Sequence, residues 1–351
     1  NKSSVSWIRW SHWSRTNRQA NRKSFRMEYV NFGKAGVKVS RLALGLAFRR
    51  QPDADIAERT VERAIEHGIN FIDCANAYGL NNDGTTRGTS EEVLGRVLKR
   101  HRDDLFISSK VYAAIGDGPN DGGGSRYHIM REIDRTLTRL DTDHIDLYIL
   151  HDFDPTTPVD ETLRAMDDLV TTGKIRYIGL SNHRAWQVIR ALWTQDKLGL
   201  DPLICVQEPY NLLNRDIEME MIPAIHSHGF GLMTYSPLAV GLLSGAYVPG
   251  EAPPAGSLYA TVRRDRYETE MDAAARDIID ALHEVAATHN KTIAQTAINW
   301  VLSHPEISAA ITGGDTPEHM DDNIGAIGWS ITDHERERLD ELSFGQRRVL
   351  Q

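Results

Sequence analysis

The sequence predicts a (β/α)8 barrel, an α/β fold in which eight parallel strands close into a ring surrounded by helices. Short apolar runs that read as buried strands alternate with stretches in helical spacing, and eight such runs can be counted. Polar residues able to carry chemistry stand where several runs end, which is where active sites lie in such barrels. A doubly wound open sheet is the alternative, but no Gly-x-Gly-x-x-Gly turn follows a strand.

The elements follow in order along the chain. Residues 28–32 and 37–41 flank a Gly-bearing turn, which predicts a β-hairpin before the barrel. The eight expected strands end near Gly45, Asp73, Lys110, Leu150, Leu180, Gln207, Tyr235 and Ile311. Helical spacing predicts helices at residues 55–67, 89–99, 125–140 and 159–172, a short one opening at Pro317, and extra helices near the C-terminus. Thr89 or Ser90 is expected to cap the second helix.

Composition excludes several classes of function. The 351-residue chain has a formal net charge of -9, which argues against nucleic acid and anionic membrane surfaces as partners. Cys74 and Cys205 are the only cysteines, so a disulfide framework and a thiolate zinc site are both excluded, and a reducing cytoplasm is the expected location. No apolar run approaches the roughly 18 residues of a membrane span.

Residues 1–26 differ from the rest of the chain. They contain seven basic residues, three tryptophans and no acidic residue. Such composition is found in transit peptides and in tails that bind membranes or nucleic acids. Because Met27 begins the enzyme-like sequence, we favour an extension that comes from cloning or upstream translation, and expect disorder or loose packing. Residues 27–351 are expected to form one barrel domain.

Four residues with complementary chemistry stand at the ends of three successive predicted strands. Asp73 ends one strand, and Tyr78 follows it by five residues. Lys110 and His151 end the next two strands. A phenol is a poor acid at neutral pH and needs a neighbouring cation to donate a proton, and Lys110 is such a cation.

On these residues the sequence resembles the aldo-keto reductases, in particular the branch of the potassium-channel β-subunits and aryl-alcohol dehydrogenases, from about Met27 to the C-terminus. The family tetrad falls on Asp73, Tyr78, Lys110 and His151. The resemblance implies hydride transfer between NAD(P)H and an aldehyde or ketone, with Tyr78 as proton donor. Lys110 would lower the pKa of Tyr78, and Asp73 would keep Lys110 charged. His151 would orient the carbonyl as a neutral donor and share the proton transfer at low pH.

The resemblance also places the cofactor in the second half of the chain. Ser181, Asn182 and Gln207 would hold the nicotinamide carboxamide, and Tyr235 would stack on the nicotinamide. A loop after Tyr235 would cover the pyrophosphate, and Asp322 and Asn323 would face adenine. The cofactor residues implied are Gly45, Ser181, Asn182, Gln207, Tyr235, Ser236, Pro237, Leu238, Gly241, Leu242, Gly313, Asp315, His319, Asp322 and Asn323.

The sequence departs from the family where a 2′-phosphate would bind. The family often has Arg, Lys or Ser at the position of Asp315 and Gln at the position of His319. It often has Lys where this chain has Ala246. A carboxylate repels a phosphate but accepts hydrogen bonds from a ribose diol. We therefore expect NADH to be accepted or favoured, unless an arginine at 263, 264 or 266 reaches the phosphate instead.

The substrate is less well defined. Phe48, Tyr112 and Phe153 are candidate pocket walls, and the surrounding loops are rich in Gly, Asn and Asp. That composition suits a sugar or another hydroxylated carbonyl, while aromatic and aliphatic aldehydes stay open. The physiological direction and the oligomeric state are not readable from the sequence.

Three alternatives accompany this interpretation. A cofactor-binding regulatory subunit of the same fold would have little turnover, although all four tetrad positions are filled. A phosphate-binding barrel such as a sugar-phosphate isomerase would need a Gly-rich loop, which Gly313 and Gly314 supply only beside an unfavourable Asp315. A metal site at His144, Asp146, His151 and Asp152 is disfavoured because these residues would not converge, so no metal is expected.

Overall fold

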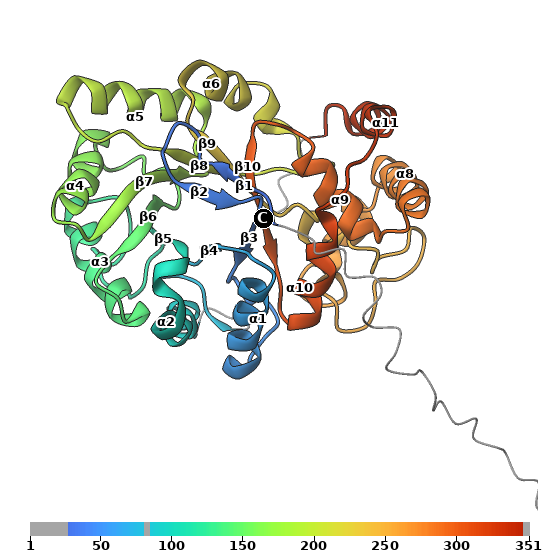
Figure 1. The fold of residues 1–351 in the computed structure, drawn as a ribbon, viewed down its shortest axis with the longest axis horizontal. Helices are drawn as coiled ribbons and strands as arrows, with labels where there is room; N and C mark the ends of the chain where they lie inside the picture. Colours follow the sequence, from blue (N-terminus) through green and yellow to red (C-terminus); the bar gives the residue numbers. More distant parts are fainter. Residues whose placement is uncertain (1–26, 81–84, 347–351) are drawn as a thin grey trace, which may run out of the picture.

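The computed structural model describes residues 27–80 and 85–346, so residues 1–26, expected to be an extension, lie outside the described part. Eight parallel strands close into a barrel in the order β10-β3-β4-β5-β6-β7-β8-β9 (Figure 1). The barrel strands are β3 (Leu42–Gly45), β4 (Phe71–Asp73), β5 (Phe106–Val111), β6 (Ile145–Leu150), β7 (Ile175–Ser181), β8 (Cys205–Pro209), β9 (Gly231–Tyr235) and β10 (Ile307–Gly313). The predicted (β/α)8 barrel is thus confirmed.

Helices surround the barrel on its outside, as Figure 1 shows. They are α1 (Ala54–Glu66), α2 (Thr89–His101), α3 (Arg126–Leu140), α4 (Val159–Thr171), α5 (Ala185–Leu198), α6 (Met221–His228), α7 (Tyr267–Glu270), α8 (Ala273–His289), α9 (Ile293–Leu302), α10 (Pro317–Asn323) and α11 (Asp333–Ser343). Helices α10 and α11 follow the last barrel strand, as expected for the C-terminus, and α11 packs against α8. Because helices cover the outside and side chains fill the inside, every residue of β3, β4 and β5 is buried, including the polar residues of β4 and β5.

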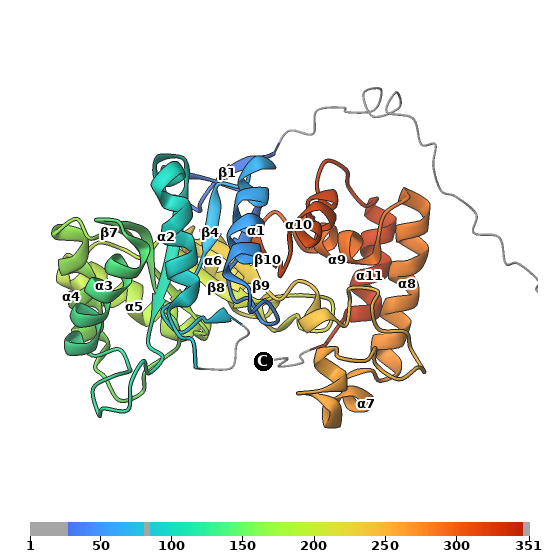
Figure 2. The same cartoon turned by 90° about the horizontal axis from the view of Figure 1, so that it is seen from below.

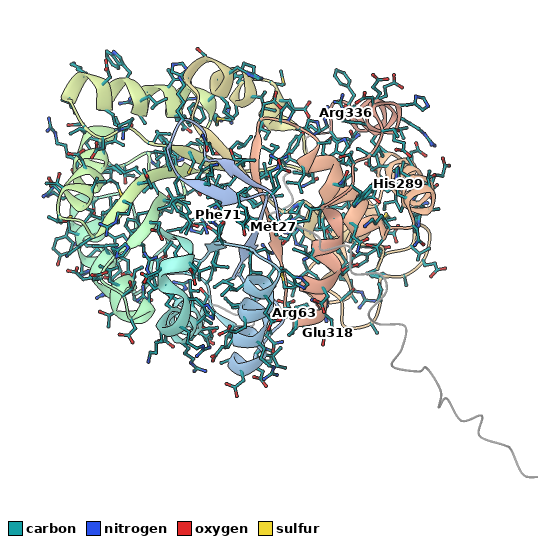
Figure 3. All side chains as sticks on the ribbon, in the orientation of Figure 1. Met27, Arg63, Phe71, His289, Glu318 and Arg336 are labelled. Carbon is teal, nitrogen blue, oxygen red and sulfur yellow. The ribbon has the colours of Figure 1, made fainter. Side chains whose placement is uncertain are left out.

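The predicted hairpin closes one end of the barrel. It consists of β1 (Tyr29–Asn31) and β2 (Lys38–Ser40), which pair antiparallel. Phe32 follows β1, is fully buried, and packs edge-on against Phe71 and Phe106 with ring centres 5.5 and 6.1 Å apart. Figure 3 shows Phe71 inside the ring of strands. Figure 2 shows the hairpin at one end and the segment carrying α7 at the other. That segment follows β9, so the end away from the hairpin is the carboxyl end of the strands.

The start of α2 corrects the expected cap. Gly88, with φ of 87°, precedes the helix, and no side chain caps it. The hydroxyl of Thr89 instead donates to Thr86 O at 2.7 Å and accepts from Leu80 N at 2.9 Å. Thr89 therefore stabilises the loop that follows Tyr78 rather than the helix terminus.

Candidate active site

A buried ion pair lies where β4 ends. The Nζ of Lys110 lies 2.6 Å from Oδ2 of Asp73 and donates to the carbonyl oxygen of Cys74 at 2.9 Å. The other oxygen of Asp73 accepts from the hydroxyl of Ser108 at 2.6 Å and from Nε2 of Gln207 at 3.1 Å. Parallel pairing produces this arrangement, because Asp73 stands opposite Ser108 in the register of β4 and β5. Both charges are thus held rigidly and away from water.

Tyr78 and His151 contact each other next to the ion pair of Asp73 and Lys110. The hydroxyl of Tyr78 lies 3.4 Å from Nε2 of His151, and their rings contact edge-on. The Nζ of Lys110 lies 4.6 Å from the centre of the Tyr78 ring. The structure therefore brings all four tetrad residues together, with two groups that can hydrogen-bond a single oxygen atom.

The electrostatics of these residues differ in part from the expectation. Burial raises the pKa of Tyr78, and the nearby Lys110 acts in the opposite direction without outweighing it. Lys110 thus acts on the pKa of Tyr78 in the expected direction, but burial makes the net shift upward. Burial alone would lower the pKa of Lys110, but Asp73 and Tyr78 raise it, so Lys110 stays charged.

The pKa of His151 is lowered to about 3 by burial and by the charge of Lys110. The imidazole is consequently neutral at physiological pH, as expected. With a pKa of about 3, the ring would carry a proton to share only in strongly acidic solution.

Asn182 links two other predicted site residues, His151 and Tyr235. Its amide nitrogen donates to the carbonyl oxygen of His151 at 2.8 Å, and its Oδ1 accepts from the hydroxyl of Tyr235 at 2.8 Å. Ser181 donates to the carbonyl oxygen of Gln207 at 2.9 Å. The hydroxyl and amide groups expected to hold a carboxamide therefore gather at the ends of β7 and β8.

Backbone strain concentrates in the loops after the strands. Seven described residues other than glycine have positive φ, and five of them follow barrel strands: Tyr112, Asn182, Ser236, Ala239 and Val240. The other two, Asp141 and Asn290, end helices. Strained conformations persist where the surrounding structure enforces them and cluster at functional sites. The surrounding structure therefore fixes the backbone of the loop from Ser236 to Leu242, which contains the expected Pro237, Leu238 and Gly241.

The predicted adenosine end lies around α10. Asn323 donates to the carbonyl oxygen of Gly313 at 2.9 Å, and Asp322 accepts from Gln295 at 2.9 Å. His319 is exposed on the same helix. Asp315 precedes the helix, and its carbonyl oxygen accepts from Nε2 of Gln51 at 2.7 Å.

An ion pair joins α10 to α1. Nε of Arg63 and Nε2 of His67 each approach Oδ1 of Asp321, at 2.6 and 2.7 Å. Figure 3 labels Arg63 on α1 and Glu318 on α10, the two helices that pack against each other here. Contacts between the helices thus fix the position of α10.

The three candidate pocket walls have different environments. Phe48 is only 2% exposed and packs into the core between barrel and helices, so its side chain is not an open wall. Tyr112 directly follows β5 and is partly exposed. Phe153 contacts the rings of His183 and Trp186, with centres 5.7 and 6.2 Å away.

The metal alternative has no geometric support. Asp146 lies at the start of β6, where it accepts from Ile107 N and pairs with Arg102, whereas His151 follows the opposite end of that strand. Within residues 27–80 and 85–346, no group of three or more His, Cys, Asp or Glu side chains could hold a metal ion.

Sequence reasoning missed three residues of this region. Ser108 lies two positions before Lys110 on a strand, hence on the same face, so the period of the strand is the signal that could have found it. Gln51 carries no such signal, because its contact with Asp315 joins segments that are distant in sequence. His183 directly follows the predicted Ser181 and Asn182 and contacts Ser181, so its position beside them is the signal that could have found it.

Comparison with known proteins agrees with this geometry. The profile of the aldo/keto reductase family matches residues 41–343. The chain belongs to the aldo/keto reductase family. It is 36% identical to an uncharacterized oxidoreductase of Bacillus subtilis over 313 residues, which is 87% of this chain and 92% of the relative. It is also 36% and 34% identical to probable voltage-gated potassium channel β-subunits of Arabidopsis thaliana and Oryza sativa, over 86% of this chain and 91% of each relative.

The aldo/keto reductase family is a family of oxidoreductases, and the protein belongs to it. The alternative of an unrelated sugar-phosphate isomerase is therefore wrong. The family uses NAD(P)H, and the hydroxyl and amide groups at the ends of β7 and β8 suit a nicotinamide carboxamide, which needs both donors and acceptors. No helix in the described part of the chain is long and apolar enough to cross a membrane.

Proposed function

We propose that the protein is an NAD(P)H-dependent reductase of aldehydes or ketones, with Tyr78 as proton donor. The observation that carries this proposal is the convergence of the Tyr78 hydroxyl and His151 Nε2, 3.4 Å apart, beside a buried lysine. A carbonyl oxygen within reach of both groups would be held by two hydrogen bonds.

Each residue of the tetrad has a separate role in this proposal. Tyr78 gives its proton to the carbonyl oxygen as negative charge develops there. Lys110 stabilises the phenolate that remains, and Asp73 keeps Lys110 charged and fixed. Neutral His151 orients the carbonyl. When bound, the dinucleotide supplies the hydride, and Ser181, Asn182, Gln207 and Tyr235 would hold its nicotinamide.

We infer further that NADH is accepted at least as well as NADPH. The resemblance implies that Asp315 would put a carboxylate beside a 2′-phosphate and that Ala246 would supply no cation there. Two of the arginines that could bind a 2′-phosphate instead already pair with an acidic residue. Arg263 is buried, and both Arg263 and Arg266 pair with Glu270. Arg264 is exposed and remains the one competing cation of the three.

A fluorescence titration with NADH and with NADPH, followed by a panel of sugar and aromatic aldehydes, tests both statements. We expect NADH to bind at least as tightly as NADPH and to be oxidised by an aldehyde. A hundredfold preference for NADPH would contradict the cofactor inference while leaving the reductase intact. Failure of both nucleotides to bind would overturn the proposed function.

A second candidate is a cofactor-binding regulatory subunit with little turnover, because two relatives carry the name of potassium channel β-subunits. The filled tetrad favours the enzyme. Co-purification with a membrane protein, together with negligible turnover on every carbonyl tested, would favour the subunit instead.

A further inference from the structure

The loop after β7 places a histidine of fixed tautomer beside the tetrad. Nδ1 of His183 lies 2.6 Å from the carbonyl oxygen of Ser181. A carbonyl oxygen only accepts, so Nδ1 must carry the hydrogen. Burial lowers the pKa of His183, which keeps the ring neutral. Nε2 therefore offers only a lone pair, and it can accept a hydrogen bond but cannot donate one.

The surroundings hold this ring in place. The backbone nitrogen of His183 donates to the buried carboxyl group of Glu208 at 2.9 Å. No hydrogen bond joins Nε2 to another described residue, and His183 keeps 6% of its surface exposed, so Nε2 is an acceptor that the described part of the chain does not use. An unused acceptor on a rigid ring at the solvent boundary is suited to a ligand.

His183 belongs to the same rim as the tetrad. β6 and β7 pair side by side with Leu150 opposite Leu180, so the loops that follow them are adjacent. Asn182, the neighbour of His183, holds the carbonyl oxygen of His151. Phe153, two residues beyond His151, packs perpendicular to the His183 ring at 5.7 Å.

Two further features extend this rim. Trp186 continues the aromatic wall from Phe153, and its side chain is 53% exposed. Asp152 is an exposed carboxylate close enough to act on His183 and on Tyr112. The rim therefore presents two hydrogen-bond acceptors, Nε2 of His183 and the carboxylate of Asp152, beside aromatic rings. A ligand with many hydroxyl donors and with C–H groups that pack on those rings would fit it.

We propose that His183, with Phe153 and Trp186, selects carbonyl substrates that carry hydroxyl groups next to the carbonyl carbon. This inference rests on the proposed reductase function and names its substrate class as polyhydroxylated aldehydes or ketones. The hydroxyl nearest the reacting carbon donates to Nε2 of His183, and a longer chain lies along Phe153 toward Trp186.

The test compares D-glyceraldehyde with propanal, which has the same carbon chain and no hydroxyl groups. His183→Phe keeps an aromatic ring beside Phe153 but removes Nε2. His183→Asn also removes the Nε2 acceptor, while its amide can still donate to Ser181 O. We expect both variants to lower kcat/KM for glyceraldehyde about tenfold, the effect of one lost hydrogen bond, and to change kcat/KM for propanal less than about twofold.

The aromatic wall has a matched control on the same helix. Trp186 and Trp193 both lie exposed on α5, but only Trp186 contacts Phe153. We expect Trp186→Ala to lower kcat/KM for D-xylose, whose open chain is longer, and Trp193→Ala to leave it unchanged. Thermal melts and the Kd of the cofactor verify that each variant is folded.

Two other outcomes are separable. If both His183 variants lower kcat/KM for the two aldehydes equally, His183 acts by positioning Asn182, and the proposed selection is wrong while the reductase stands. If the wild-type protein oxidises neither NADH nor NADPH with either aldehyde, the proposed function and the inference built on it are both overturned.

Discussion

The carboxylate of Asp73 lies 2.6 Å from the Nζ of Lys110, and solvent reaches almost none of either side chain. Attraction between buried charges offsets their loss of hydration only when the geometry and the additional hydrogen bonds are good. Here Ser108, Gln207 and the carbonyl oxygen of Cys74 supply those bonds. The ion pair is therefore a feature on which stability and chemistry both depend.

Removal of one partner should be strongly destabilising. Asp73→Asn leaves Lys110 buried without a counterion, and we expect the free energy of unfolding to fall by about 3–5 kcal/mol. Adding Lys110→Met should recover much of that loss, because the unpaired charge is gone. Urea unfolding at pH 7 measures both variants.

An exposed ion pair provides the control for this experiment. Arg126 and Asp168 pair on the surface, with side chains 49% and 45% exposed. Asp168→Asn should cost less than about 1 kcal/mol. Equal losses in Asp73→Asn and Asp168→Asn would show that burial of the first pair has no special energetic effect.

Tyr78→Phe should abolish turnover and leave cofactor binding within about twofold of wild type. The variant keeps the ring beside Lys110 and removes only the hydroxyl that donates the proton. Steady-state kinetics and a fluorescence titration separate the two effects. The matched control is Tyr177→Phe, at the opposite end of the barrel, which should retain full activity. Full activity in Tyr78→Phe would remove the proposed role of the tetrad.

Strands and their order could be predicted from sequence because apolar runs and polar strand ends are local signals. The eight strands from Gly45 to Ile311 were predicted in this way, and register in a parallel barrel then brings Asp73, Lys110 and His151 to one end. The resemblance supplied their assignment to a tetrad.

Properties that depend on side chains distant in sequence could not be predicted. The net pKa of Tyr78 depends on how fully the fold buries it, and that burial outweighs the effect of Lys110. The contact between Gln51 and Asp315 spans most of the chain. Phe48 was expected to be a pocket wall because it follows a strand, but only the packing of the helices shows that it is buried.

The neutral His151 makes stability depend on pH in a defined direction. Its pKa is about 3 in the folded protein and near 6.5 in an unfolded chain, so the unfolded state binds more protons between these values. The stabilising effect of the neutral ring is fully present above about pH 6.5 and is lost as pH falls toward 3.

Urea unfolding of the wild type and of His151→Asn at pH 7 and pH 5 measures this effect. We expect the wild type to lose more stability than the variant between the two pH values, because the variant has no ring to protonate. Parallel losses would show that His151 does not contribute to the pH dependence.

The last prediction concerns cofactor choice. Asp315→Ser combined with Ala246→Lys removes a carboxylate and adds a cation where a 2′-phosphate would bind, and hydrogen bonds to charged groups contribute about 1.5–3 kcal/mol. We therefore expect the Kd for NADPH to fall about tenfold or more while the Kd for NADH changes little. Asp265→Ser, which removes an exposed carboxylate from the loop before α7, serves as the control and should change neither Kd. An unchanged Kd for NADPH in the double variant would show that the phosphate binds elsewhere, with Arg264 as the next residue to replace.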